Sequence, residues 1–257
     1  MDIIDFHIHP FIDEPTNVCM YRNTVSDWKQ IKRDFRKCGI SKVCGSVIPK
    51  KKLEKVESFT EVKSLNDEAL ALRDIFNGFY IPGVHIHPNF VKESCDELER
   101  VHNKGVRLVG ELVPYFMGWE NYFDDNMKEI YDCIDKLNMV VSVHTMSEEN
   151  LEQAVKLFPN ITFVAAHPGD KNTFFRHLER IKKYPNYYLD FSGTGIFRYG
   201  LIKFGVEQVG SERFLFGTDY PICNPKMYVS CVEFENISLE DKENIFFNNA
   251  KNILKIN

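Results

Sequence analysis

Two histidines separated by one residue, His7 and His9, stand near the start of the chain at the end of an apolar run. Alternate residues of a β-strand face the same side, so a strand here would direct both imidazoles toward one point. Two imidazoles on one face can bind a divalent cation together. An isolated pair of this kind is more often structural, so the interpretation depends on the rest of the chain.

Three later apolar runs also end in a side chain that metals favour. Val-Val-Ser-Val leads to His144, Phe-Val-Ala-Ala leads to His167, and Phe-Leu-Phe-Gly-Thr leads to Asp219. In a parallel (β/α)8 barrel all strands end at the same face. Five candidate ligands from four strands would therefore meet at one place, and we interpret them as a metal site.

A sixth candidate, Glu111, lies inside an otherwise apolar run at residues 106–114. Burying a carboxylate without a partner is costly, so this side chain should have one. It would serve either as a ligand that bridges two metal ions or as a hydrogen-bond partner of a ligating histidine. The sequence leaves both roles open.

Bringing these residues to one face requires strands that alternate with helices, and the hydrophobic pattern shows this alternation. The predicted strands are Ile3–His7, Lys42–Ile48, Tyr80–Ile86, Arg107–Val113, Val140–His144, Thr162–His167, Tyr187–Phe191 and Arg213–Gly217. Eight strand–helix repeats favour an α/β fold in which a parallel sheet closes into a TIM barrel. No linker or change of composition divides residues 1–257, so we expect one domain.

Two local predictions concern the helices. Ser94 and Glu97 resemble a capping box, which predicts that a helix begins at Ser94. His102 and His177 lie in helical patterns among charged residues, so we expect both on the surface.

Composition limits the partners and the compartment. A net charge of −5 argues against a nucleic acid or an acidic membrane as the main partner. No apolar run approaches the roughly twenty residues of a membrane span, and no leader peptide is evident. The seven scattered cysteines indicate reduced, mostly buried thiols in a cytoplasmic protein. We expect a small-molecule substrate, and a homodimer is the default oligomer.

The chain resembles the amidohydrolase superfamily, and within it the amidohydrolase-2 group of metal-dependent barrel enzymes. The resemblance covers nearly the whole chain and is carried by Asp5-Phe6-His7-Ile8-His9, His144, His167-Pro168-Gly169, Leu189-Asp190-Phe191-Ser192-Gly193, Phe216-Gly217-Thr218-Asp219-Tyr220-Pro221 and Asn248-Asn249-Ala250. It implies that His7, His9 and His144 are metal ligands. It also implies that Asp219 binds the metal and accepts a proton from the attacking water. His167 would bind a second metal or position water and substrate for catalysis.

Strand four departs from the common family pattern. Some members with two metals carry a carboxylated lysine there and others a glutamate, whereas many amidohydrolase-2 members have one metal and no ligand on this strand. Glu111 matches the glutamate version. We therefore expect one or two divalent ions per chain, with zinc as the first choice, to lower the pKa of a bound water.

Four residues near the predicted strand ends are candidates for substrate binding. His87 belongs to a second His-x-His pair with His85, Arg22 and Arg198 follow the first and seventh strands, and Tyr115 follows the fourth. An arginine could pair with a substrate carboxylate, although solvated arginines are common. Tyr115 could form a pocket wall or pack over the barrel.

The sequence favours a metal-dependent hydrolase that attacks the carbonyl of an amide, lactone or ester. The main alternative is a metal-dependent decarboxylase of an aromatic or unsaturated acid, which resembles members of the same group. A TatD-type nuclease and an inactive barrel that only binds are the remaining interpretations. The acidic net charge opposes the nuclease, and the complete ligand set opposes the inactive barrel.

Overall fold

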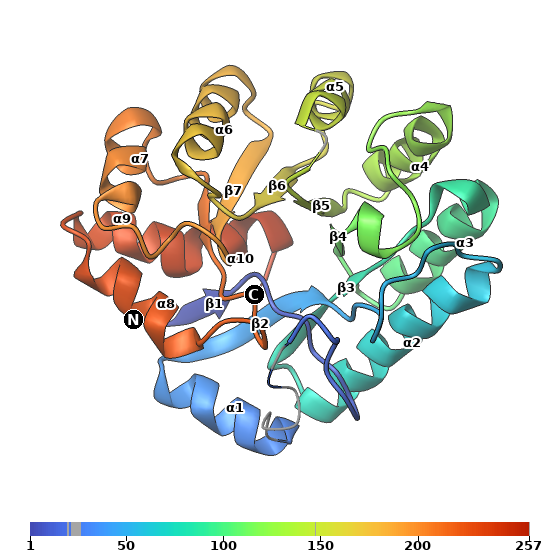
Figure 1. Ribbon diagram of the computed structural model, residues 1–257, viewed down its shortest axis with the longest axis horizontal. Helices are drawn as coiled ribbons and strands as arrows, with labels where there is room; N and C mark the ends of the chain where they lie inside the picture. The colour runs from blue at the N-terminus through green and yellow to red at the C-terminus, as the bar shows by residue number, and fades with distance from the viewer. Residues whose placement is uncertain (20, 22–26, 147, 257) are drawn as a thin grey trace.

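The computed structural model describes residues 1–19, 21, 27–146 and 148–256. In this part of the chain eight parallel strands form one sheet in the order β1 to β8, which confirms the expected (β/α)8 barrel (Figure 1). The strands are β1 (Ile3–Asp5), β2 (Ile40–Ser46), β3 (Tyr80–Val84), β4 (Leu108–Leu112), β5 (Val140–His144), β6 (Phe163–Ala166), β7 (Tyr187–Phe191) and β8 (Phe214–Phe216). Each overlaps one predicted strand.

Helices follow the strands and surround the sheet (Figure 1). They are α1 (Trp28–Lys37), α2 (Phe59–Phe76), α3 (Val91–His102), α4 (Asp125–Lys136), α5 (Glu148–Leu157), α6 (Lys171–Lys183), α7 (Leu201–Val209), α8 (Pro225–Phe234), α9 (Leu239–Glu243) and α10 (Asn249–Leu254). Short helical turns occupy Pro88–Phe90, Pro114–Phe116 and Asn244–Asn248.

The barrel closes between β1 and β8. The backbone N–H of Phe6 donates to the carbonyl of Phe216 at 2.8 Å. Just beyond the strands, the N–H of Asp219 donates to the carbonyl of His7 at 2.7 Å. We call this junction of β1 and β8 the seam. It places the start of the chain directly beside Asp219, more than 200 residues later in the sequence.

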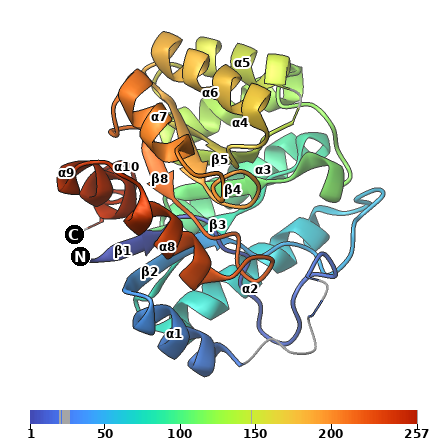
Figure 2. The same ribbon diagram turned by 60° about the vertical axis from the view of Figure 1, so that its left-hand side comes forward.

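Two apolar clusters hold the barrel together. The larger one lies between the strands and the surrounding helices. The smaller one brings together buried residues from six strands, including Ile4, Leu108 and Val164, with Ala250 and Leu254 of α10. Figure 2 shows α10 and the chain ends gathered near β1. The last helix therefore packs against buried residues of the barrel strands.

The two local helix predictions are partly wrong. α3 begins at Val91, so Ser94 is not its cap; its hydroxyl instead bonds the backbone N–H and carbonyl of His87, at 3.0 and 3.1 Å. A turn containing Pro88 leads directly into this helix, which moves its start to an earlier residue.

His177 is fully buried rather than on the surface, and its Nδ1 lies 2.8 Å from the Tyr187 hydroxyl. Burial lowers the pKa of His177 to about 3.

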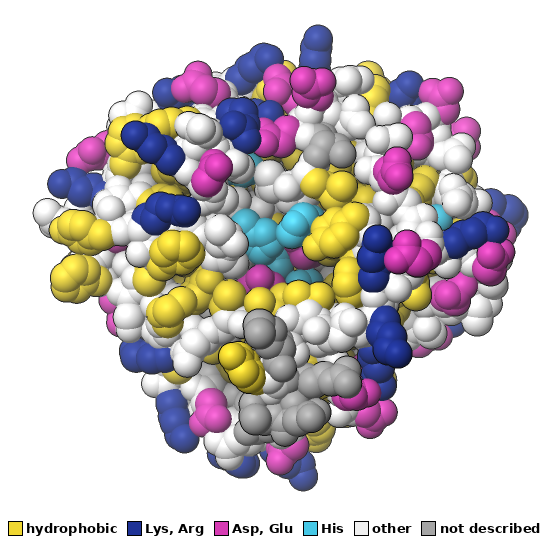
Figure 3. Space-filling model, in the orientation of Figure 1, with side chains coloured by type: hydrophobic (Ala, Val, Ile, Leu, Met, Phe, Trp, Pro, Cys, Tyr) yellow, Lys and Arg dark blue, Asp and Glu magenta, His cyan; other side chains and the backbone are white. Residues whose placement is uncertain are grey.

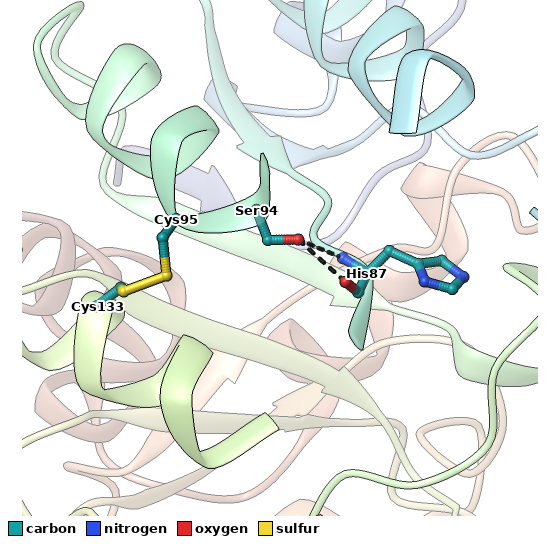
Figure 4. Close-up of a disulfide and its surroundings, with 4 residues drawn as sticks. All are labelled: His87, Ser94, Cys95 and Cys133. Carbon is teal, nitrogen blue, oxygen red and sulfur yellow. Dashed lines mark hydrogen bonds between the residues drawn. A yellow bond between two sulfur atoms is a disulfide. The ribbon is translucent and has the colours of Figure 1, made fainter. Parts of the chain in front are cut away.

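The expectation that all cysteines are reduced is also wrong. Cys95 on α3 and Cys133 on α4 form a disulfide, with Cα atoms 5.9 Å apart (Figure 4). The two residues lie 38 positions apart on separate helices, so their pairing depends on how these helices pack and not on a spacing in the sequence. Among the described helices, none is both long and apolar enough to cross a membrane.

Candidate metal centre

A cavity of about 380 Å³ opens at the carboxyl ends of the strands. Figure 3 shows histidine and acidic side chains in a hollow near the centre of this face, with apolar side chains around it. The lining includes six of the residues singled out in the sequence, namely His9, Glu111, Tyr115, His144, His167 and Asp219. The other described lining residues are Val18, Ile48, Val113, Phe116, Thr145, Gly169, Thr173, Thr194 and Ile222.

The first group of candidate ligands combines residues from the start of the chain with residues much later in the sequence. Oε2 of Glu111 lies 3.4 Å from Nε2 of His7 and 3.3 Å from Nε2 of His9. Oδ1 of Asp219 lies 3.7 and 3.5 Å from the same two nitrogens. Glu111 of β4 and Asp219, which follows β8, therefore each approach the two histidines that follow β1. We call these four residues the first half-site.

The second group uses the other oxygen of the same glutamate. Oε1 of Glu111 lies 3.0 Å from Nδ1 of His144 and 3.8 Å from Nε2 of His167. The donor atoms of these three residues all lie within 4.8 Å of one another. We call this group the second half-site, and Glu111 contacts both half-sites.

The first half-site fits a divalent metal. Nδ1 of His7 is 2.9 Å from Oδ2 of Asp190, and Nδ1 of His9 is 3.1 Å from the carbonyl oxygen of Ser46. These acceptors place the ring hydrogens on Nδ1 and leave lone pairs on Nε2. Nε2 of His7 is buried and has no hydrogen-bond partner among the described residues. An imidazole and carboxylate donor set suits zinc, manganese or iron.

The ionisable side chains of the buried site shift one another's pKa values. Burial alone would lower the pKa of His7, but the carboxylates of Asp190 and Glu111 raise it well above its usual value. Burial would raise the pKa of Glu111, but His7 and His144 hold it well below its usual range. The negative charge of the buried carboxylates is thus stabilised by positive charge on the neighbouring histidines. A divalent cation at the half-sites would supply that charge in place of protons on the histidines.

Irregular backbone conformations at the strand ends orient the candidate ligands toward the cavity. β4 shifts register between Val109 and Leu112, which turns Glu111 into the barrel. Gly110, at φ 94°, makes this possible, because a Cβ there would lie 2.1 Å from the carbonyl oxygen of Ser142. His167 and Asp219 also adopt positive φ angles, 69° and 63°. Such conformations are uncommon for non-glycine residues and cluster at functional sites.

Asp5 supports the candidate ligands, although little in the sequence indicated this role. Asp5 is buried and accepts hydrogen bonds from the backbone N–H of Thr218 at 2.9 Å, from its hydroxyl at 2.6 Å and from the N–H of His7 at 3.2 Å. Burial raises the pKa of Asp5 to about 7. Asp5 thus ties the ends of β1 and β8 together beneath the ligands. Besides its place in the family motif, its only signal was that of an acidic residue inside an apolar strand.

The candidate substrate-binding residues lie in different places. Tyr115 lines the cavity, is 45% exposed, and its ring centre is 5.5 Å from that of His144. Arg198 donates to the carbonyl oxygen of Gly169 on the cavity rim at 2.7 Å. His87 is fully buried and is not among the described lining residues. Arg22 lies outside the described residues, and its role stays a prediction.

The family model described as Amidohydrolase matches residues 4–256, so the chain belongs to the amidohydrolase-2 family. No curated protein matches the chain. Among solved structures, it is similar to 2,6-dihydroxybenzoate decarboxylase from Rhizobium, with 13% identity, a TM-score of 0.76 and coverage of 100% of this chain and 99% of that one. A TIM-barrel protein from Bordetella bronchiseptica is 18% identical, with a TM-score of 0.76 and 99% coverage of both chains.

A third similar structure is 5-carboxyvanillate decarboxylase from Novosphingobium aromaticivorans, complexed with manganese and 4-hydroxy-3-methoxy-5-nitrobenzoic acid. Its identity is 14% and its TM-score 0.71, with coverage of 88% of this chain and 80% of that one. At these identities the structural likeness establishes the shared barrel fold.

Proposed function

We propose that the protein is a metal-dependent decarboxylase of a small aromatic or unsaturated carboxylic acid. The cavity above the half-sites carries this proposal. Its walls include Val113, Tyr115 and Phe116, and no described lining residue is a lysine or arginine. A flat apolar acid would pack against these walls, and its carboxylate would find its counter-charge at the metal.

The comparisons support this alternative over the hydrolase that the sequence favoured. Two of the similar proteins are named as decarboxylases of aromatic acids, and one was crystallised with manganese. Manganese is as good a candidate as the zinc expected from the sequence, since histidine and carboxylate ligands accept both.

The reaction would break the bond between the carboxyl carbon and the rest of the substrate, release CO₂ and put a proton on the carbon left behind. A bound metal would hold the substrate carboxylate and stabilise negative charge. Asp219 lines the cavity and is 7% exposed, so its carboxylate would take a proton from a water molecule and pass it to that carbon. Tyr115 would orient the ring of the substrate from above His144.

The test is CO₂ release from a panel of hydroxybenzoic acids by the metal-loaded protein. In D₂O one deuterium should replace the carboxyl group, and Asp219→Asn should reduce turnover by at least about 100-fold, the lower end of what a general acid contributes. Absence of CO₂ from the whole panel, together with hydrolysis of esters, lactones or amides by the same preparation, would reject decarboxylation.

Hydrolysis remains the second candidate because Glu111 contacts both half-sites. If each half-site held a metal ion, the ions would supply a water of lowered pKa for attack on a carbonyl. Metal analysis of the wild type and Glu111→Ala separates the cases. About two equivalents that fall to one would favour the hydrolase. About one equivalent, unchanged in the variant, would make Glu111 a hydrogen-bond partner of His144 and favour the decarboxylase.

A further inference from the structure

Ser192, which directly follows β7, connects the histidines of the two half-sites. It is fully buried. Its hydroxyl oxygen lies 3.1 Å from Nδ1 of His7 and 3.0 Å from Nδ1 of His167. The same hydroxyl donates to Oδ1 of Asp190. One serine therefore contacts one ring nitrogen of a histidine from each half-site.

Counting hydrogens decides which groups donate. Oδ1 of Asp190 also accepts the backbone N–H of Ser192 at 3.0 Å, so this oxygen is an acceptor. The single hydroxyl hydrogen of Ser192 points at it, and the serine oxygen has only lone pairs left for the histidines. His7 directs its Nδ1–H to the other oxygen of Asp190 at 2.9 Å. Nδ1 of His167 must then carry a hydrogen, which it donates to Ser192.

We infer that Asp190 and Ser192 form a positioning pair that fixes His167 as the Nδ1–H tautomer, so that its Nε2 presents a lone pair to the site. In this form His167 can bind a metal or accept a proton, but it cannot donate a hydrogen bond to the substrate.

The backbone supports this arrangement. Gly193 follows Ser192 at φ 51°, and a Cβ on it would lie 2.3 Å from Nδ1 of His167. The ring therefore lies directly against the backbone of this turn. The inference rests on the metal centre of the proposed function and not on the reaction that the centre catalyses.

The first experiment measures the tautomer in metal-free protein labelled with ¹⁵N-histidine. Long-range ¹⁵N–¹H correlation spectra distinguish the two neutral forms, and the His167 signals are identified by their loss in His167→Asn. We expect the Nδ1–H form in the wild type and its loss in Ser192→Ala. Ser94→Ala is the matched control, because Ser94 is equally buried but bonds the backbone of His87. An Nε2–H form in the wild type would overturn the inference, and this outcome needs no variant to fold.

The second experiment measures metal affinity by titrating Mn²⁺ or Zn²⁺ into the same proteins. Loss of a hydrogen-bond partner behind a ligand typically weakens metal binding by about 10–100-fold. We expect that loss for Ser192→Ala and wild-type affinity for Ser94→Ala. Unchanged affinity in a Ser192→Ala protein that retains its fold would contradict the positioning role. A failure to release CO₂ would reject the proposed decarboxylation and leave both measurements interpretable.

Discussion

Gly193→Ala tests whether the turn after β7 sets the position of His167. The new Cβ would lie 2.3 Å from Nδ1 and 2.6 Å from Cε1 of that ring. Ordinary contact begins at 3.4 Å, so the ring or the turn must shift by the difference, 3.4 − 2.3 = 1.1 Å. A displacement of ~1 Å at a reacting group can reduce turnover by ~100-fold.

The substitution also imposes backbone strain, because residue 193 has a φ of 51°. An alanine in the left-handed region costs about 1–2 kcal/mol. For a chain of this size that corresponds to a fall in Tm of roughly 2–8 °C. Gly78→Ala is the matched control, since Gly78 has a φ of 73° and no atom within 4 Å of the added Cβ. It should show the strain without the clash.

The assays are thermal unfolding, metal content and turnover, measured on both variants. We expect both to lose stability, and only Gly193→Ala to lose metal affinity and activity. If Gly193→Ala bound metal and turned over like Gly78→Ala, His167 would tolerate a shift of about an ångström. The geometric argument for its position would then be refuted.

Three further predictions follow from other parts of the molecule. Tyr115→Ala should raise KM for an aromatic acid by about two- to tenfold while changing kcat less, because an aromatic contact contributes about 0.5–1.5 kcal/mol; steady-state kinetics will check this. Replacing Cys95 and Cys133 with serine should lower the free energy of unfolding by about 2–4 kcal/mol, measured by denaturant titration, and adding reductant to the variant should have no further effect. The pKa of His177 falls from 6.5 to about 3 on folding, so the unfolded chain binds the proton first. Stability should fall as pH drops below 6.5, by up to about 1.4 kcal/mol per pH unit, and His177→Gln should remove this part of the slope in denaturant titrations across pH; a slope equal to that of the wild type would contradict the assignment.

The strands could be predicted because buried parallel strands are nearly continuous apolar runs. Their exact ends could not. Predicted strands one and six extend through His7 and His167, whereas β1 ends at Asp5 and β6 at Ala166. The backbone departs from regular strand hydrogen bonding at the positions where the candidate ligands turn toward the cavity. His167 has a positive φ angle that no local sequence pattern predicts.

The ligand types could be predicted from polar residues that end apolar runs. Their supporting contacts could not, because these depend on which strands become neighbours. Asp190 and Ser192 were visible in the sequence, but their contacts with His7 and His167 require β7 to lie beside both β6 and β8, and β8 beside β1. The burial of His177 likewise depends on the rotation of α6 against Tyr187.

The seam between β1 and β8 has a consequence for folding. The hydrogen bond between Asp5 and the Thr218 backbone joins residues 213 positions apart, and contacts of such long range form slowly because a large loop must close first. The first half-site shares this seam, since His7 and His9 lie on one side and Asp219 on the other. A metal ion there would bind only the closed barrel, in which both sides of the seam are together. It would therefore shift the folding equilibrium toward the closed barrel by mass action. Metal supply during synthesis would then influence how much chain reaches the closed barrel.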